Sequence, residues 1–100
     1  MPDTISPQEA KALLAEGKAI FLDVRRKADK EADPEMLPGA VWHDPEKVDE
    51  WKRTLPLEAQ VVIYCMRGGS VSKNTLAALR NAGLRASFIE GGIEAWKKER

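Results

Sequence analysis

The sequence predicts an α/β domain with a mainly parallel sheet. Short apolar runs of strand length alternate along the chain with stretches whose apolar residues recur at helical spacing, which is the pattern of successive βαβ units. The apolar runs are continuous, as is typical of strands that helices cover on both faces. Parallel strands of this kind are joined by right-handed crossovers.

The N-terminal part is expected to form a helix and then a strand. Ser6 suits the N-cap of this helix, Pro7 its first position and Gly17 its C-terminal stop. The apolar run 19–22 predicts a strand, and the polar residues that end it lie within 23–25.

The middle of the chain is expected to be more irregular. The stretch 26–35 is highly charged and contains a proline, so we expect a solvated loop there. A short strand is predicted over 40–42. A helix is predicted over 45–55, because one proline stands at its start and another follows its end.

The C-terminal half returns to a regular alternation. A buried strand is predicted over 61–64, and the apolar spacing that follows predicts a helix over 71–82 that Gly83 ends. A last strand is expected over 86–89. The final helix, over 93–98, ends in basic residues that suit the negative end of its dipole.

Composition limits the classes of function. A chain of 100 residues that is 43% apolar predicts one small domain over 1–100. The 16 basic and 16 acidic residues balance, so bulk charge favours neither nucleic acid nor an anionic membrane as a partner. No leader or membrane-spanning run is evident, and we expect a reducing, cytoplasmic location. One cysteine and one histidine are too few for a structural metal site, and no metal or cofactor is expected.

The single cysteine, Cys65, directly follows the strand expected at 61–64. A lone cysteine is often a small apolar core residue. Here, however, two consecutive glycines follow in the loop, which favours a backbone that closely approaches a ligand. The helix over 71–82 then adds the positive end of its dipole, which favours a thiolate or an oxyanion. We therefore expect Cys65 to be a reacting group.

Four segments, taken in order, resemble the single-domain rhodanese family, and the resemblance covers nearly the whole chain. The segments are Asp23-Val24-Arg25, Leu37-Pro38-Gly39-Ala40, Val61 to Ser70, and Phe88 to Trp96. The resemblance implies a three-layer domain with a sheet of about five strands and helices on both faces. The chain departs from the family at Glu35-Met36, where many rhodaneses have a Gly-His pair.

The same resemblance implies a sulfurtransferase. Cys65 would attack the outer sulfur of thiosulfate or another persulfide donor, and the resulting persulfide would pass its sulfur to cyanide or a thiol. No histidine stands beside Cys65 in the sequence, so backbone amides, the helix dipole and nearby cations would activate it. His43 is expected to be a surface or hydrogen-bonded residue.

Several residues are expected to bind the substrate or to support the site. Arg67 would bind the anionic part of the donor through its guanidinium, and Lys73 is either a second contact or a surface residue. Ser70 and Ser72 would donate hydroxyls to sulfur or cap the helix, and capping is favoured. The full substrate-binding set is Met66, Arg67, Gly68, Gly69, Ser70, Arg25 and Lys73, with Asp23 as structural support.

Two other functions are compatible with the pattern. Phosphatases and arsenate reductases related to rhodaneses have a longer loop that ends in an arginine, but Val71 stands at that place here. The other alternative is a sulfur-carrier or regulatory module that receives sulfur from a relay protein, with 26–35 as its docking surface.

Overall fold

The computed structural model describes residues 3–17, 19–67 and 69–98 and contains a five-stranded sheet. Every pair of neighbouring strands is parallel, in the order β1-β5-β4-β2-β3. This confirms the predicted fold class. The strands are β1 (Thr4–Ile5), β2 (Ala19–Asp23), β3 (Val41–Trp42), β4 (Gln60–Tyr64) and β5 (Arg85–Ile89).

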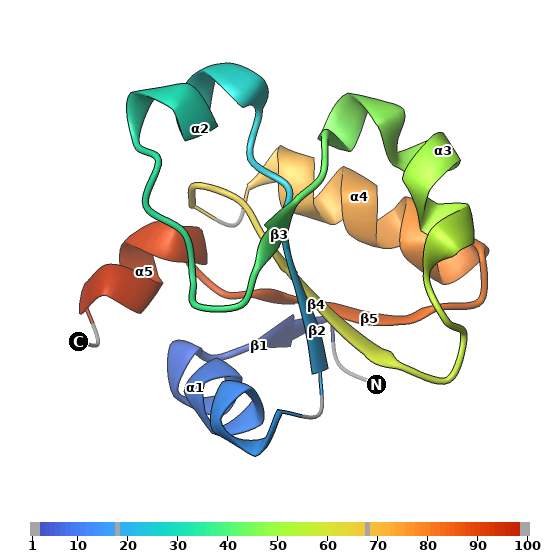
Figure 1. Ribbon diagram of the computed structural model, residues 1–100, viewed down its shortest axis with the longest axis horizontal. Coiled ribbons are helices and arrows are strands. Elements are labelled where there is room, and N and C mark those ends of the chain that lie inside the picture. Colours follow the sequence, from blue (N-terminus) through green and yellow to red (C-terminus); the bar gives the residue numbers. More distant parts are fainter. Residues whose placement is uncertain (1–2, 18, 68, 99–100) are drawn as a thin grey trace.

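Helices cover both faces of the sheet and give three layers (Figure 1). They are α1 (Pro7–Glu16), α2 (Lys27–Ala32), α3 (Val48–Trp51), α4 (Ser70–Asn81) and α5 (Gly92–Lys98), and two 3-10 turns, Pro45–Lys47 and Lys52–Thr54, flank α3. The pairs α1 with α5 and α3 with α4 lie on opposite faces. None of the described helices is long and apolar enough to cross a lipid bilayer.

The central strand β4 is buried on both faces. Val61 and Ile63 pack in the core beneath α3 and α4, whereas Val62 and Tyr64 pack in the core beneath α1 and α5. Cys65 continues this alternation into the α3–α4 side. The period of two residues therefore determines the side of the sheet on which the thiol lies.

The ends of α1 agree with the sequence prediction. The Ser6 hydroxyl accepts a hydrogen bond from the Glu9 N–H at 3.1 Å, and the Glu9 carboxylate accepts one from the Ser6 N–H at 3.1 Å. Gly17 closes the helix in the left-handed conformation, with φ at 67°.

Three predictions of secondary structure need correction. The stretch 26–35 is not simply a loop, because α2 occupies 27–32; no residue of α2 is buried, so it has no apolar stripe to reveal it. The helix expected over 45–55 is split into two 3-10 turns and one short α-helix. Strand β1 was missed because two residues are too short to show a period.

Candidate active site

Cys65 lies at the carboxyl end of β4 and forms part of the wall of a hollow of about 540 Å³. We call this the Cys65 hollow. Cys65 is only 5% exposed, because it also packs in the core beneath α4. Core and site therefore meet at one side chain. The wall of the hollow is formed by Arg25, Arg26, Asp29, Cys65, Met66, Arg67, Gly69, Ser70 and Val71.

The first turn of α4 forms one side of the Cys65 hollow. Gly69 is the N-cap of α4, and no side chain caps the helix there. The capping role expected of Ser70 or Ser72 is therefore wrong: Ser70 is the first helical residue, and the Ser72 hydroxyl is buried with no partner among the described residues. The first-turn amides of a helix have no acceptor within it, and its dipole is positive at this end.

The start of α5 holds the backbone on the other side of Cys65. The Ile93 N–H donates to the Cys65 carbonyl at 2.9 Å, and the Glu94 N–H donates to the Met66 carbonyl at 3.2 Å. Gly92 permits this approach, because its φ is +63° and a Cβ there would lie 2.4 Å from the Cys65 carbonyl oxygen. Sequence reasoning missed this contact, although the paired glycines 91 and 92 were its signal.

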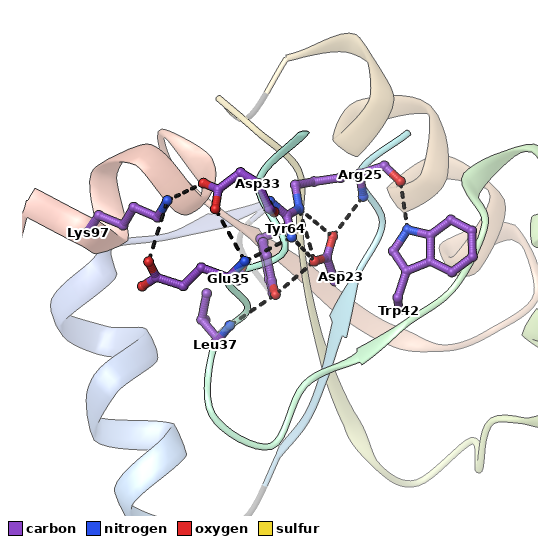
Figure 2. Close-up of polar contacts among 8 residues, drawn as sticks. All are labelled: Asp23, Arg25, Asp33, Glu35, Leu37, Trp42, Tyr64 and Lys97. Atoms are coloured by element: carbon purple, nitrogen blue, oxygen red, sulfur yellow. Dashed lines mark hydrogen bonds and ion pairs between the residues drawn. The ribbon is translucent and has the colours of Figure 1, made fainter. Parts of the chain in front are cut away.

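Asp23 and Arg25 form a buried ion pair beside the site (Figure 2). The Arg25 Nε donates to both Asp23 carboxylate oxygens at 3.1 and 3.0 Å, and its two terminal nitrogens donate to the carbonyls of Asp33 at 2.8 Å and Glu35 at 2.9 Å. The side chain is fully buried, and all three of its nitrogens are engaged. Arg25 thus holds the segment 33–35, and because it also lines the Cys65 hollow, its expected contact with substrate stays a prediction.

Tyr64 extends this arrangement across the sheet. Its hydroxyl donates to Asp23 Oδ2 at 3.2 Å and accepts from the Leu37 N–H at 3.2 Å (Figure 2). Burial raises the pKa of Tyr64 far above its usual value, so the hydroxyl keeps its proton. The Trp42 indole adds a bond to the Arg25 carbonyl at 2.9 Å. We call the side chains of Asp23, Arg25 and Tyr64 and their partners in 33–37 the brace.

The brace is tied to α5 at the surface. Lys97 forms an ion pair with Asp33 and a longer contact of 3.7 Å with Glu35 (Figure 2). The hydrogen bond from Lys97 lowers the pKa of Asp33 below its ordinary value, and the Glu35 N–H adds to the effect.

The other expected cations differ in their relation to Cys65. Arg67 lines the hollow, but its side chain is 79% exposed and its Nε contacts Glu94 Oε2 at 2.7 Å. Lys73 lines a different hollow with Asp3 and Arg80 and is not in the wall of the Cys65 hollow, so a contact with the donor stays a prediction. Gly68 lies outside the described residues.

Sequence reasoning missed two charged residues of the wall, Arg26 and Asp29. Both belong to the stretch that was interpreted as a solvated loop. The available signal was their position directly after the strand that ends at Asp23, because side chains beyond the carboxyl ends of parallel strands gather at one edge.

His43 is separate from the Cys65 hollow. Its ring stacks on Trp51 with centroids 4.8 Å apart, and burial lowers the pKa of the imidazole. It lines a hollow of about 600 Å³ beside α3. Among the described residues, no three His, Cys, Asp or Glu side chains are grouped to hold a metal ion.

A family model and several known proteins match this chain. The family model of the rhodanese-like domain matches residues 6–99. A thiosulfate sulfurtransferase, GlpE of Pseudomonas entomophila, is 33% identical, and the match covers 93% of this chain and 83% of that protein. A tRNA 2-selenouridine synthase of Shewanella piezotolerans is 38% identical over 53 residues, but the match spans only 14% of its length.

Solved structures share the fold. A rhodanese-related protein of Thermoplasma volcanium superposes with a TM-score of 0.84 at 19% identity, covering 98% of this chain and 93% of that one. A Rhodopseudomonas palustris protein, described as a "Possible Tyrosine Phosphatase", superposes with a TM-score of 0.84 at 23% identity, covering 97% and 80%. At these identities the likeness extends to the fold alone.

Proposed function

Because this chain belongs to the rhodanese-like domain family, we propose that it is a sulfurtransferase that carries sulfur as a persulfide on Cys65. The observation that supports this most directly is the position of the thiol. Cys65 directly follows the central strand and lines a hollow beside the uncapped first turn of α4. A nucleophile and donors for an anion therefore share one small space.

The proposed reaction has two displacements. The Cys65 thiolate attacks the outer sulfur of thiosulfate, the new bond to Sγ forms as the S–S bond of the donor breaks, and sulfite leaves with the bonding electrons. Cyanide or a thiol then attacks the outer sulfur of the persulfide and returns the Cys65 thiolate. Each cycle moves one sulfur atom, and the protein needs no cofactor for it.

The surroundings of Cys65 determine how the anionic sulfur is stabilised. The first-turn amides and the dipole of α4 favour negative charge on the persulfide. The N–H groups of Ile93 and Glu94 donate hydrogen bonds to the carbonyls of Cys65 and Met66, which fixes the start of the loop. The loop residues Met66 to Ser70 remain the proposed contacts of the donor, although Arg67 would have to share its guanidinium with Glu94.

Two other functions predict different results. A phosphatase of this architecture would need an arginine clamp, and Val71 lies in the wall at that place. A sulfur carrier would react slowly with thiosulfate but take sulfur rapidly from a partner such as a cysteine desulfurase. Nothing in the geometry of the Cys65 hollow favours either over transfer of sulfur between small molecules.

A direct test measures thiocyanate formation from thiosulfate and cyanide. Wild-type protein should turn over, Cys65→Ser should fall to the uncatalysed rate, and Arg53→Gln, a change outside the hollow, should retain activity. An aryl phosphate should not be hydrolysed. Thiocyanate formation by Cys65→Ser at the wild-type rate, or phosphate release without thiocyanate, would contradict the proposal.

A further inference from the structure

The charges around the Cys65 hollow fall into two groups. Two of its four ionic side chains are already paired, Arg25 with the buried Asp23 and Arg67 with Glu94 at 2.7 Å. The other two, Arg26 and Asp29, form no ion pair with any described residue. The hollow therefore presents one uncommitted positive charge and one uncommitted negative charge.

Arg26 and Asp29 stand one helical turn apart at the start of α2. Arg26 is the N-cap residue and is exposed, and Asp29 is half-buried in the first turn. Arg26 and Val71 also line a second hollow of about 200 Å³, together with Glu46, so Arg26 belongs to the walls of two hollows. A bound molecule in reach of Cys65 can contact both charges.

Helix stability accounts for only one of these two charges. A carboxylate in the first turn suits the helix dipole, so Asp29 has a structural reason to be there. Arg26 has none: its side chain does not cap α2, and a cation at this end opposes the dipole. Its position in the walls of two hollows would suit it to contact an anionic group of a bound molecule.

A doubly charged anion such as thiosulfate matches this wall poorly. The guanidinium of Arg26 would attract it, but the carboxylate of Asp29 in the same wall would repel it. A molecule that carries both charges meets no such conflict, because its carboxylate can face Arg26 while its ammonium faces Asp29.

We propose that the preferred sulfur donor is a zwitterionic amino-acid persulfide, with Arg26 binding its carboxylate and Asp29 its ammonium group. This inference rests on the proposed sulfur transfer through Cys65 and names the donor class. Both residues act as specificity determinants, and Cys65 remains the nucleophile.

The transfer balances without an added oxidant or reductant. The Cys65 thiolate attacks the outer sulfur of the hydropersulfide R–S–SH, and a bond from Sγ to that sulfur forms. The S–S bond of the donor breaks, and its electron pair leaves with the inner sulfur. That sulfur takes the proton of the hydropersulfide, so the products are the Cys65 persulfide anion and the amino-acid thiol R–SH.

The test compares four donors that differ in charge. Cysteine persulfide carries both groups, the persulfide of 3-mercaptopropionate lacks the ammonium, the persulfide of cysteamine lacks the carboxylate, and thiosulfate is a plain dianion. For each, rapid quenching and intact mass give the rate at which the protein gains the mass of one sulfur atom. Wild-type protein should react most rapidly with cysteine persulfide.

Two variants assign the preference to residues. Asp29→Asn should lower the rate of sulfur uptake from cysteine persulfide about fivefold, which is the effect of losing one partly exposed charged contact. It should raise the rate of sulfur uptake from thiosulfate. Arg26→Gln should lower the rate of sulfur uptake from the persulfides of cysteine and 3-mercaptopropionate about fivefold and leave the rate with cysteamine persulfide unchanged. Asp49→Asn and Arg53→Gln change the same charges outside the hollow and should behave as wild type.

The outcomes separate this inference from the function on which it rests. If wild-type protein gains sulfur from all four donors at similar rates, or if Asp29→Asn behaves like Asp49→Asn, the donor class is wrong while the Cys65 persulfide stands. If no donor places sulfur on Cys65, the proposed function fails and the donor class fails with it.

Discussion

The two polar regions that flank the end of β4 differ in how completely their groups are paired. In the brace, the Asp23 carboxylate, the Arg25 guanidinium and the Tyr64 hydroxyl are buried, and each has protein partners (Figure 2). In the Cys65 hollow, α4 begins without a side-chain cap, and Arg26 and Asp29 form no ion pair with the described residues.

This difference distinguishes support from function. A buried charge must be compensated within the fold, so groups of the brace are committed to one another. In the hollow, Arg26 and Asp29 are not buried and can remain uncommitted until a substrate arrives. Changes in the brace should therefore lower stability, and changes in the hollow should alter transfer with little effect on folding.

The largest expected effect on stability comes from Asp23→Asn. The variant leaves the Arg25 guanidinium buried beside a neutral amide, which should lower the free energy of unfolding by about 3–5 kcal/mol. Urea denaturation followed by tryptophan fluorescence measures it. Arg26→Gln, in the other region, should leave the midpoint unchanged, and equal midpoints for the two variants would remove the distinction between brace and hollow.

Gly92→Ala should come next, because it disturbs the contact that joins the two regions. The added Cβ would lie 2.4 Å from the Cys65 carbonyl oxygen, on a residue whose φ is +63°. Backbone strain and weakened hydrogen bonds from Ile93 and Glu94 should together lower the free energy of unfolding by about 2–4 kcal/mol.

Gly17→Ala is the matched control for that substitution. Gly17 has nearly the same φ, +67°, but nothing lies within 4 Å of its added Cβ. Gly17→Ala should lower the free energy of unfolding by about 1 kcal/mol, which is the cost of placing alanine in the left-handed conformation. Equal losses of unfolding free energy for the two glycines would show that the close approach to Cys65 contributes nothing.

Tyr64→Phe should have a smaller effect than Asp23→Asn, because no charge is left unpaired. The variant removes the hydroxyl between Asp23 and the Leu37 N–H, and we expect a loss of about 1–3 kcal/mol. Denaturation monitors the loss, and the rate of sulfur uptake by the folded variant should stay close to that of wild type. A large drop in that rate at full folding would place Tyr64 in the reaction instead of the brace.

The smallest expected effect is a dependence of stability on pH from His43. Burial lowers the pKa of His43 in the folded protein, so the unfolded chain binds the proton more readily. Stability from this residue is present above pH 6.5, the ordinary pKa of histidine, and decreases as the pH falls toward the folded value. Wild-type protein should lose more unfolding free energy than His43→Gln between pH 7 and 5, and parallel profiles would contradict this.

Much of the fold could be predicted from the sequence because the core is periodic. The strand β4 and the helix α4 carry apolar patterns long enough to be recognised, and both lie within two residues of their expected ranges. Elements held by other means gave no such signal. Strand β1 has two residues, and α2 is a short charged helix whose neighbouring segment is fixed by Arg25.

The candidate site was predicted in part for the same reason. The position of Cys65 follows from the end of a buried strand, which sequence reveals. Whether a charged side chain is free to bind substrate depends on whether it forms an ion pair within the fold. The partners of such a pair can be far apart in the sequence, as Arg67 and Glu94 are, and the sequence alone does not reveal the pair. The sequence alone suggests substrate for Arg25 and a solvated loop for Arg26, whereas in the structure Arg25 is paired with Asp23 and both arginines line the Cys65 hollow.

The central claim is that Cys65 carries sulfur, and the most direct measurement is the intact mass of the protein after incubation with a sulfane-sulfur donor. Wild-type protein should gain the mass of one sulfur atom, peptide mapping should locate it on Cys65, and added cyanide should remove it as thiocyanate. The Cys65→Ser variant should gain nothing. A wild-type protein that stays unmodified, or a variant that gains the same mass, would contradict the account.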